Sequence, residues 1–196
     1  GRSKAFWEPI YDKLVGAYPD NLTNITLDHF IKGINKPASS LIRTEADELS
    51  YPLHIIIRYE TEKMMFMEDA DIEKLPEVWN QKYKDYMGIS PKDDASGILQ
   101  DTHWSWGEFG YFPSYAIGSA IASQLYYKML EVMPLEQYLQ EGNLTPIREF
   151  LRDSIHKYGA TKNTNQLLME VTGEEFNADY YIKYLKEKYE KLYDIV

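Results

Sequence analysis

Two short segments of the chain carry the polar residues that could take part in chemistry. The first is I-R-T-E-A-D-E-L, in which Arg43 follows an apolar extended piece and precedes Glu45 and Asp47. Acids in this position are typical of a helix N-terminus, where the helix dipole favours each negative charge by a few tenths to about 1 kcal/mol. The other interpretation is an arginine held by acids and directed at a ligand carboxylate, which a guanidinium binds through two parallel hydrogen bonds.

The second segment is G-I-L-Q-D-T-H-W-S-W-G-E-F-G-Y-F-P-S-Y, residues 97–115. A lone histidine in a protein is more often a structural residue than a catalyst, because its imidazole is readily satisfied by neighbouring groups. Several polar groups in one loop rich in glycine and tryptophan instead favour a site that orients a substrate and stabilises an oxyanion. The residues of this kind are Gln100, Asp101, His103 and Tyr111.

The common catalytic signatures are absent from the sequence. There is no H-E-x-x-H, no G-x-S-x-G and no phosphate-binding G-x-x-x-x-G-K, and the chain has no cysteine that could act as a nucleophile. None of the four histidines lies three or four residues from another, so no helix face can present a histidine pair to a metal. The sequence by itself therefore predicts no metal site.

Composition excludes several classes of partner. The 196 residues carry a net charge of −10, with basic and acidic residues interleaved, which disfavours binding to the phosphates of nucleic acid. No apolar run approaches the roughly 18 residues of a membrane-spanning helix, so we expect no membrane insertion. The absence of cysteine fits a reducing compartment, and we expect a cytoplasmic protein.

The elements that must position these two segments are mostly helical. Apolar spacing, capping residues, and the placement of proline and glycine predict the element boundaries. Pro52 falls inside one predicted helix, which must either kink there or restart with Ser50 as its cap. The helices expected are residues 3–18, 26–34, 45–67, 75–87, 114–132, 145–158 and 178–193.

Residues 88–113 differ from the rest, because glycine, proline and aromatic residues recur there without a helical period. A loop of this length in a compact domain is usually functional. We expect at most a very small β element, formed by residues near 41–43 and 98–102. The fold class predicted is all-α. No repeat or linker interrupts the chain, so residues 1–196 are expected to form a single helical unit.

At the two polar segments, the sequence resembles the carboxypeptidase Taq (M32) metallocarboxypeptidases. That family carries an I-R-x-x-A-D motif and a G-x-x-Q-D-x-H-W motif, and both stand here without a mismatch, at residues 42–47 and 97–104. Their order is also that of the family, and the resemblance covers nearly the whole chain. Further similar stretches are L-H-I-I-I-R-Y-E (53–60), L-P-E-V-W-N (75–80), G-Y-F-P-S-Y (110–115), I-H-K-Y-G (155–159) and V-T-G-E (171–174).

The resemblance implies a largely helical zinc peptidase that removes single residues from the carboxyl termini of peptides. In that family zinc is held by H-E-x-x-H and a downstream glutamate, and both precede a stretch that is similar to residues 1–7. The zinc ligands and the catalytic glutamate are therefore expected before Gly1, in an amino-terminal part of the enzyme. This chain alone is expected to bind no zinc and to be inactive. The partners implied are peptides with a free terminal carboxylate, the amino-terminal part and a possible homodimer.

The same resemblance assigns roles to residues of this chain. Arg43 would bind the terminal carboxylate of the substrate, while His103 and Tyr111 would donate hydrogen bonds to the oxyanion. The choice between Tyr111 and Tyr115 as the oxyanion donor stays open. The further residues implied are Tyr115 and Gln100 in substrate binding, and Asp47, Asp101, Glu45 and Trp104 in support of the site.

Two other functions are compatible with the sequence. One is a non-catalytic helical module that binds peptides or proteins through an aromatic cleft. The other is a subunit that becomes active by pairing with a separately encoded amino-terminal half.

Overall fold

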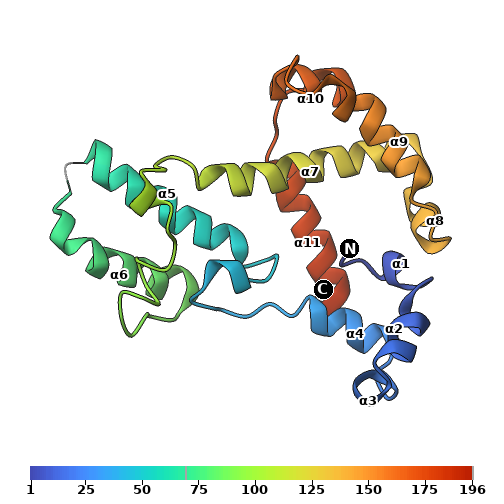
Figure 1. The fold of residues 1–196 in the computed structure, drawn as a ribbon, viewed down its shortest axis with the longest axis horizontal. Helices are drawn as coiled ribbons and strands as arrows, with labels where there is room; N and C mark the ends of the chain where they lie inside the picture. The colour runs from blue at the N-terminus through green and yellow to red at the C-terminus, as the bar shows by residue number, and fades with distance from the viewer. Residues whose placement is uncertain (69, 196) are drawn as a thin grey trace. The chain divides into compact units, whose positions relative to one another are not determined.

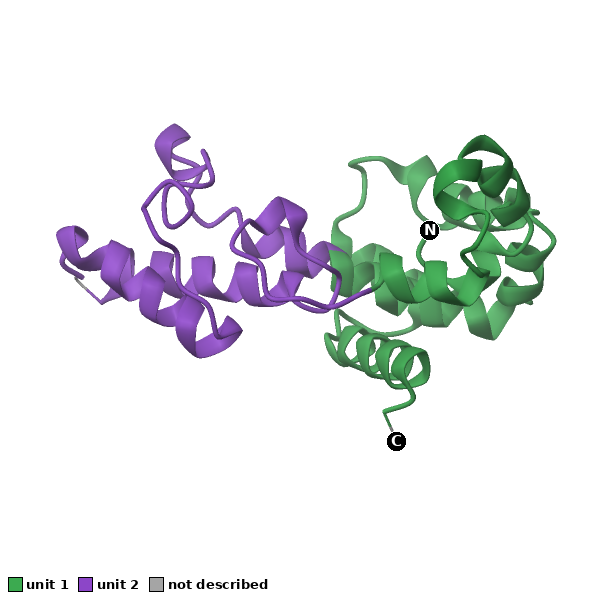
Figure 2. Ribbon diagram, turned by 90° about the horizontal axis from the view of Figure 1, so that it is seen from below, with its two compact units in different colours: residues 1–35, 119–196 green, residues 36–118 purple. Residues whose placement is uncertain are grey.

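The computed structural model describes residues 1–68 and 70–195. Its regular structure in these residues is helical, without a strand, which confirms the all-α prediction (Figure 1). No helix in the described residues is both long and apolar enough to cross a membrane. Contacts divide the chain into two compact units: residues 1–35 with 119–196 form unit 1, and residues 36–118 form unit 2 (Figure 2). The sequence predicts one unit because no linker marks either crossing, and one of them lies inside helix α7 (Pro113–Val132).

Unit 1 begins with short helices where one longer helix was expected over residues 3–18. Helix α1 (Lys4–Trp7) is separated from α2 (Tyr11–Ala17) because Pro9 has no N–H and does not fit a helix interior. Next come α3 (Pro19–Leu22) and α4 (Leu27–Ile34). The predicted cap of α4 is confirmed, since the Thr26 hydroxyl accepts a hydrogen bond from the backbone N–H of His29 at 3.2 Å.

Helix α7 begins at Pro113, one residue before its predicted start, and the remaining helices of unit 1 come after it in the chain. Two helices here, α8 and α10, were not expected. A signal for α10 is present, because Asn163 and Gln166 form a reciprocal capping box, with both hydrogen bonds at 3.0 Å. The expected helix over residues 145–158 is divided into an α-helix and a 3-10 turn. The elements are α8 (Leu135–Gln140), α9 (Thr145–Ser154), the 3-10 turn η4 (His156–Tyr158), α10 (Thr164–Thr172) and α11 (Asp179–Tyr193).

Unit 2 is built around the pair of helices α5 (Tyr51–Met67) and α6 (Leu75–Met87), which pack against each other (Figure 1). A short 3-10 turn, η2 (Ile72–Lys74), leads into α6. Gly88 ends α6 with a φ of 72°, as the position of this glycine after the last helical turn predicts. The buried core of this unit joins Ile57 of α5 to Trp79 and Tyr83 of α6. Such burial stabilises each large apolar side chain by about 1.5–3 kcal/mol.

The helix expected over residues 45–67 begins only at Tyr51, so the chain restarts at Pro52 rather than kinking there. Ser50 is the N-cap residue, as expected, but its side chain makes no capping hydrogen bond, and Asp47 organises the turn before it. The Asp47 carboxylate accepts hydrogen bonds from the backbone N–H groups of Leu49 and Ser50, each at 2.9 Å, and from the Ser50 hydroxyl at 2.6 Å. It also accepts one from the backbone N–H of Ala38 at 3.0 Å. Asp47 thus fixes the turn that leads from Arg43 into α5.

The small β element expected at residues 41–43 and 98–102 is not formed in the described residues. The two segments nevertheless meet, because the Gln100 side chain joins them. Its amide nitrogen donates to the Leu41 carbonyl at 2.9 Å, and its oxygen accepts from the Arg43 N–H at 3.0 Å. One carboxamide thus makes the two hydrogen bonds that a strand ladder would supply there, and the predicted backbone pairing was wrong for that reason.

Candidate functional site

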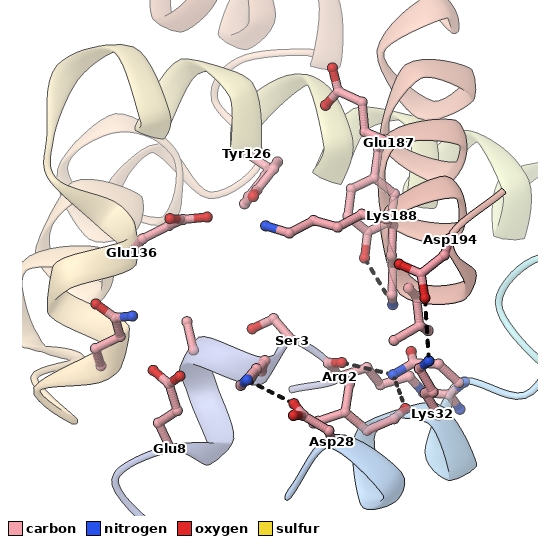
Figure 3. Close-up of a pocket in the computed structure, with 18 of the residues that line it drawn as sticks. Arg2, Ser3, Glu8, Asp28, Lys32, Tyr126, Glu136, Glu187, Lys188 and Asp194 are labelled. Carbon is pink, nitrogen blue, oxygen red and sulfur yellow. Dashed lines mark hydrogen bonds and ion pairs between the residues drawn. The ribbon is translucent and has the colours of Figure 1, made fainter. Parts of the chain in front are cut away.

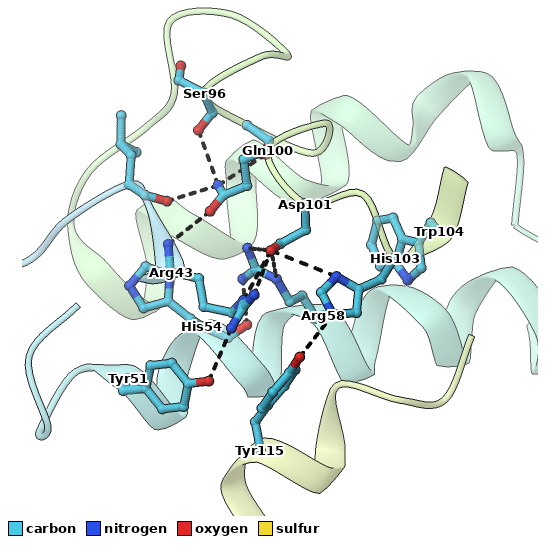
Figure 4. A network of polar contacts seen from close by, with 12 residues as sticks. Arg43, Tyr51, His54, Arg58, Ser96, Gln100, Asp101, His103, Trp104 and Tyr115 are labelled. Carbon is cyan, nitrogen blue, oxygen red and sulfur yellow. Dashed lines mark hydrogen bonds and ion pairs between the residues drawn. The ribbon is translucent and has the colours of Figure 1, made fainter. Parts of the chain in front are cut away.

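Arg43 and Asp101, one from each polar segment, form a close ion pair within unit 2 (Figure 4). The Arg43 Nη2 donates to Asp101 Oδ1 at 2.7 Å, and Nε lies 3.2 Å from both carboxylate oxygens. The Arg43 Nη1 donates to the hydroxyl of Tyr51 at 3.2 Å. Arg43 lies in the 3-10 turn η1 (Arg43–Glu45), and its guanidinium packs over the Tyr115 ring with 4.9 Å between Cζ and the ring centroid.

A second arginine, Arg58 of α5, binds the other side of the same carboxylate. Its Nε donates to Asp101 Oδ2 at 2.7 Å, and its Nη2 lies 2.6 Å from that oxygen. Arg58 is fully buried, with its Nη1 donating to the His54 carbonyl at 2.8 Å. Arg58 was not predicted as a site residue, because in the sequence it only interrupts the apolar run before it. The signal that could have found it is its i, i+4 spacing from His54 on the face of α5 that points inward.

Two positive charges therefore surround one negative charge. Burial alone would raise the pKa of Asp101, but the hydrogen bond from Arg43 and the charges of Arg58 and Arg43 outweigh it and hold that pKa below its ordinary value. Burial also acts on Arg43, where the hydrogen bonds to Asp101 and Tyr51 prevail and raise the pKa further. The Asp101 carboxylate and the two guanidinium groups together give the cluster a formal net charge of +1.

His54 lies beside this cluster and is kept neutral. Burial lowers its pKa to about 4, and the nearby charges of Arg58 and Arg43 act in the same direction. The His54 Nδ1 lies 2.9 Å from the hydroxyl of Tyr83, and that hydroxyl donates to the Leu41 carbonyl at 3.1 Å. Because the single Tyr83 proton is used in this way, Nδ1 is the protonated nitrogen and donates to Tyr83.

His103, Tyr111 and Tyr115 come together at the opposite side of Asp101. The His103 Nε2 lies 3.1 Å from the Tyr115 hydroxyl, while its Nδ1 is 4.0 Å from Asp101 Oδ1 (Figure 4). The Tyr111 ring lies beside both, with centroid distances of 5.8 Å to His103 and 5.4 Å to Tyr115. Tyr111 is 48% exposed, and its hydroxyl makes no hydrogen bond to any residue the structure describes.

The other residues assigned to the site have structural contacts. Gln100 uses both ends of its carboxamide on backbone groups, including the Gly97 carbonyl at 3.1 Å, so the geometry makes it a support for Arg43. The Trp104 indole donates to the buried carboxylate of Glu62 on α5 at 2.6 Å. Glu45 is exposed and belongs to none of the ion pairs of Arg43. Of the four acidic and aromatic residues expected to support the site, only Asp101 contacts Arg43 directly.

Unit 1 also contains a cavity, of about 700 Å³ (Figure 3). Basic and acidic side chains line it in equal number, and some are paired, as Lys4 and Asp28 are at 2.7 Å. None of the residues from the two motifs contributes to its lining. The cavity is therefore not the site that the sequence singled out.

The residues present do not fit a zinc site. Throughout 1–68 and 70–195, no three side chains of His, Cys, Asp or Glu gather where a metal ion could be held. Zinc in proteins takes three or four such ligands. Any metal chemistry would therefore need ligands from outside the described residues.

The fold and the site together define a helical protein with a buried, net-positive cluster beside a histidine and two tyrosines, an arrangement suited to holding an anionic group. The chain belongs to the carboxypeptidase Taq (M32) metallopeptidase family, whose profile matches residues 1–189. The family resemblance of the two motifs is thereby confirmed.

Relatives of known name agree with this membership. The chain is 50% identical to Carboxypeptidase 1 of Bacillus subtilis (strain 168) over 194 residues, and 39% identical to Thermostable carboxypeptidase 1 of Thermus thermophilus. It also superimposes on an M32 carboxypeptidase structure from Deinococcus radiodurans R1 with a TM-score of 0.96 at 33% identity, covering 99% of this chain and 39% of that one. Although 98% of the chain is matched, it spans only 39% and 38% of the two curated relatives.

Proposed function

We propose that this chain forms the substrate-recognition side of a metallocarboxypeptidase active site. In this proposal, it holds the free carboxylate of a peptide's last residue while the bond before that residue is hydrolysed. Family membership supports this function over a non-catalytic binding module. Zinc, in the intact enzyme, would be bound by residues that lie outside this chain.

The observation that carries the proposal is the state of the Arg43 guanidinium. It has five N–H groups, of which Asp101 occupies those on Nε and one on Nη2, while Tyr51 occupies one on Nη1. One N–H therefore remains on each terminal nitrogen, and these two atoms form the second edge with which a guanidinium binds a carboxylate. The Arg43 side chain is 9% exposed, and in this proposal the second edge is the part that a ligand reaches.

The remaining duties fall to His103 and Tyr111. His103 lies beside Asp101, and Tyr111 lies beside His103. Tyr111 would donate its exposed hydroxyl to the oxygen that develops negative charge as the carbonyl is attacked. His103 would donate to it through Nε2, in exchange for the contact with the Tyr115 hydroxyl, because its Nδ1 is buried. Tyr111 is the better placed of the two tyrosines for this role, because the Tyr115 hydroxyl already lies within hydrogen-bond distance of His103. Tyr115 would instead orient the imidazole and cover one face of Arg43.

The substrates proposed are peptides with a free carboxyl terminus, and the partner proposed is the amino-terminal part of the enzyme. A homodimer and a cytoplasmic location remain predictions. So does the inactivity of the chain by itself, which the expected position of the zinc ligands before Gly1 implies.

The experiment that tests this function replaces Arg43 by Ala in the full-length enzyme. Binding of an N-acyl amino acid should weaken at least tenfold, while binding of the corresponding amide should change little. Only the acid presents a carboxylate that can accept two parallel hydrogen bonds from the forked guanidinium of Arg43. Arg43→Lys should give an intermediate loss, because it keeps the charge without the fork. Arg148→Ala, at an exposed position of α9, is the matched control and should bind both ligands normally. Equal effects of Arg43→Ala on acid and amide would contradict the proposal.

A further inference from the structure

Arg58 is placed where it affects Arg43 without contacting a ligand. It is fully buried on α5, and its guanidinium lies between two aromatic rings, 4.9 Å from the Trp79 centroid and 5.2 Å from that of Phe112. The Arg43 guanidinium packs on the same Phe112 ring at 5.7 Å. Both arginines thus pack on one aromatic ring. Both also bind one carboxylate, that of Asp101 (Figure 4).

The charges of this cluster show what the second arginine adds. With Arg43 alone, Asp101 would form a neutral pair, and an incoming carboxylate on the second edge would meet attraction from Arg43 and, from farther away, repulsion from Asp101. Since buried charges are weakly screened, that repulsion would offset part of the attraction. With Arg58 on the other oxygen of Asp101, the cluster keeps a charge of +1.

Asp47 also places a negative charge near His54, but its carboxylate is bound by backbone N–H groups and by the Ser50 hydroxyl, and the described residues show no ion pair between it and either arginine. His54 is neutral, because its pKa lies far below neutrality. Glu62, one turn further along α5, accepts its hydrogen bond from Trp104 at 2.6 Å and is joined by no ion pair to either arginine among the described residues. Because Arg58 pairs with Asp101, the positive charge of Arg43 is not fully offset by that carboxylate.

We propose that Arg58 is a positioning residue for carboxylate recognition. Arg58 neutralises the charge of Asp101, so Asp101 can fix the orientation of Arg43 without cancelling the positive charge that Arg43 presents to a substrate carboxylate. This inference rests on the proposed function of Arg43 as the carboxylate-binding residue. The competing explanation is that Arg58 only fills the space between Trp79 and Phe112 and stabilises the fold.

The test uses the full-length zinc-loaded enzyme and measures inhibition by an N-acyl amino acid and by its amide. Arg58→Met, which preserves much of the side-chain volume, should weaken binding of the acid at least tenfold and leave the amide within about threefold. Arg58→Lys, which keeps the charge, should bind the acid within about threefold of the unmodified enzyme.

The deciding variant is the double substitution Arg58→Met with Asp101→Asn. It removes one positive and one negative charge, so the net charge returns to +1 and the preference for the acid over the amide should recover to within about threefold. A role in packing alone predicts that the double variant is no better than Arg58→Met, and that acid and amide binding fall together. That outcome would overturn the proposal.

A variant that does not fold leaves a second comparison available. If Arg58→Met is unfolded by circular dichroism, Asp101→Asn is compared with the double variant instead. Once the aspartate charge is gone, the charge of Arg43 is not offset in either variant, so removing Arg58 should lower the preference for the acid by less than the tenfold expected when Asp101 is present. A loss of tenfold or more would overturn the proposal. If the unmodified enzyme does not distinguish acid from amide, the function proposed for Arg43 fails, and the two failures are thereby told apart.

Discussion

Gln100 and Arg43 lie 57 positions apart, yet the Gln100 carboxamide oxygen accepts a hydrogen bond from the Arg43 backbone N–H at 3.0 Å. The same carboxamide donates to the Leu41 carbonyl at 2.9 Å. The Gln100 side chain therefore attaches the loop that carries Asp101 and His103 to the segment that carries Arg43, in addition to the ion pair between Arg43 and Asp101. Both groups of the site depend on this attachment for their relative position.

Replacing Gln100 by Ala should therefore destabilise the protein. Half-buried backbone groups of Leu41 and Arg43 would lose their partners, at a cost of about 1–3 kcal/mol. Urea unfolding of the chain measures this loss. Gln137→Ala is the matched control, because the Gln137 amide bonds an exposed glutamate on α8 at 2.8 Å and should change stability by no more than about 0.5 kcal/mol. A loss at Gln100 as small as that at Gln137 would contradict the role of the carboxamide.

His54 should make the stability depend on pH well above the range in which carboxylates titrate. Its pKa is about 4 in the folded protein and 6.5 ordinarily, so between these values the unfolded chain binds more protons. The unfolding free energy should fall as the pH is lowered from about 6.5 towards 4, by up to about 3 kcal/mol at about 1.4 kcal/mol per pKa unit. Above pH 6.5 this contribution should be constant.

Nuclear magnetic resonance of the His54 ring protons and urea unfolding between pH 7 and 4.5 check this prediction. His54→Asn keeps a donor towards Tyr83 but removes the titrating group, so its stability should vary less over the same pH range. A His54 ring that becomes protonated near pH 6.5 in the folded protein would show the prediction to be wrong.

Much of this fold can be predicted from local signals, and the site only in part. The cap at Thr26 and the glycine stop after α6 are decided by neighbours in the chain, so the sequence predicts them. The resemblance implied that Asp47 supports the site, and the structure shows it bound to the backbone of the turn that follows Arg43. Spacing alone does not separate such a turn contact from an ion pair with Arg43. Arg58 was missed because its role depends on a carboxylate 43 positions away. Only the folded chain shows that pairing.

His103 should act on the chemical step more than on binding. If it donates to the developing oxyanion, His103→Ala in the full-length enzyme should lower kcat by roughly a hundredfold or more while KM changes less. The alternative is packing alone, since the His103 ring lies 4.5 Å from that of Phe112 between centroids. In that case, the variant would be less stable but normally active per folded molecule. Measuring kcat together with the folded fraction separates the two roles.

The two tyrosines near His103 should respond differently to loss of their hydroxyls. Tyr111 presents an exposed hydroxyl, whereas the Tyr115 hydroxyl lies 3.1 Å from His103 Nε2. Tyr111→Phe should therefore lower kcat by ten- to a hundredfold with little change in KM, because it removes a donor to the oxyanion and keeps the ring contacts. Tyr115→Phe should lower kcat less, and mainly through the freedom that it gives the imidazole.

The pair of variants also decides which tyrosine is the donor. Combining Tyr111→Phe with His103→Ala should cost less than the product of the single effects if both donate to one oxygen, because groups that act as a unit are not additive. Combining Tyr115→Phe with His103→Ala should be indistinguishable from His103→Ala alone, since Tyr115 would act only through that imidazole. If Tyr115→Phe instead lowers kcat further in the His103→Ala background while Tyr111→Phe has no effect, Tyr115 is the donor and the assignment of Tyr111 is wrong.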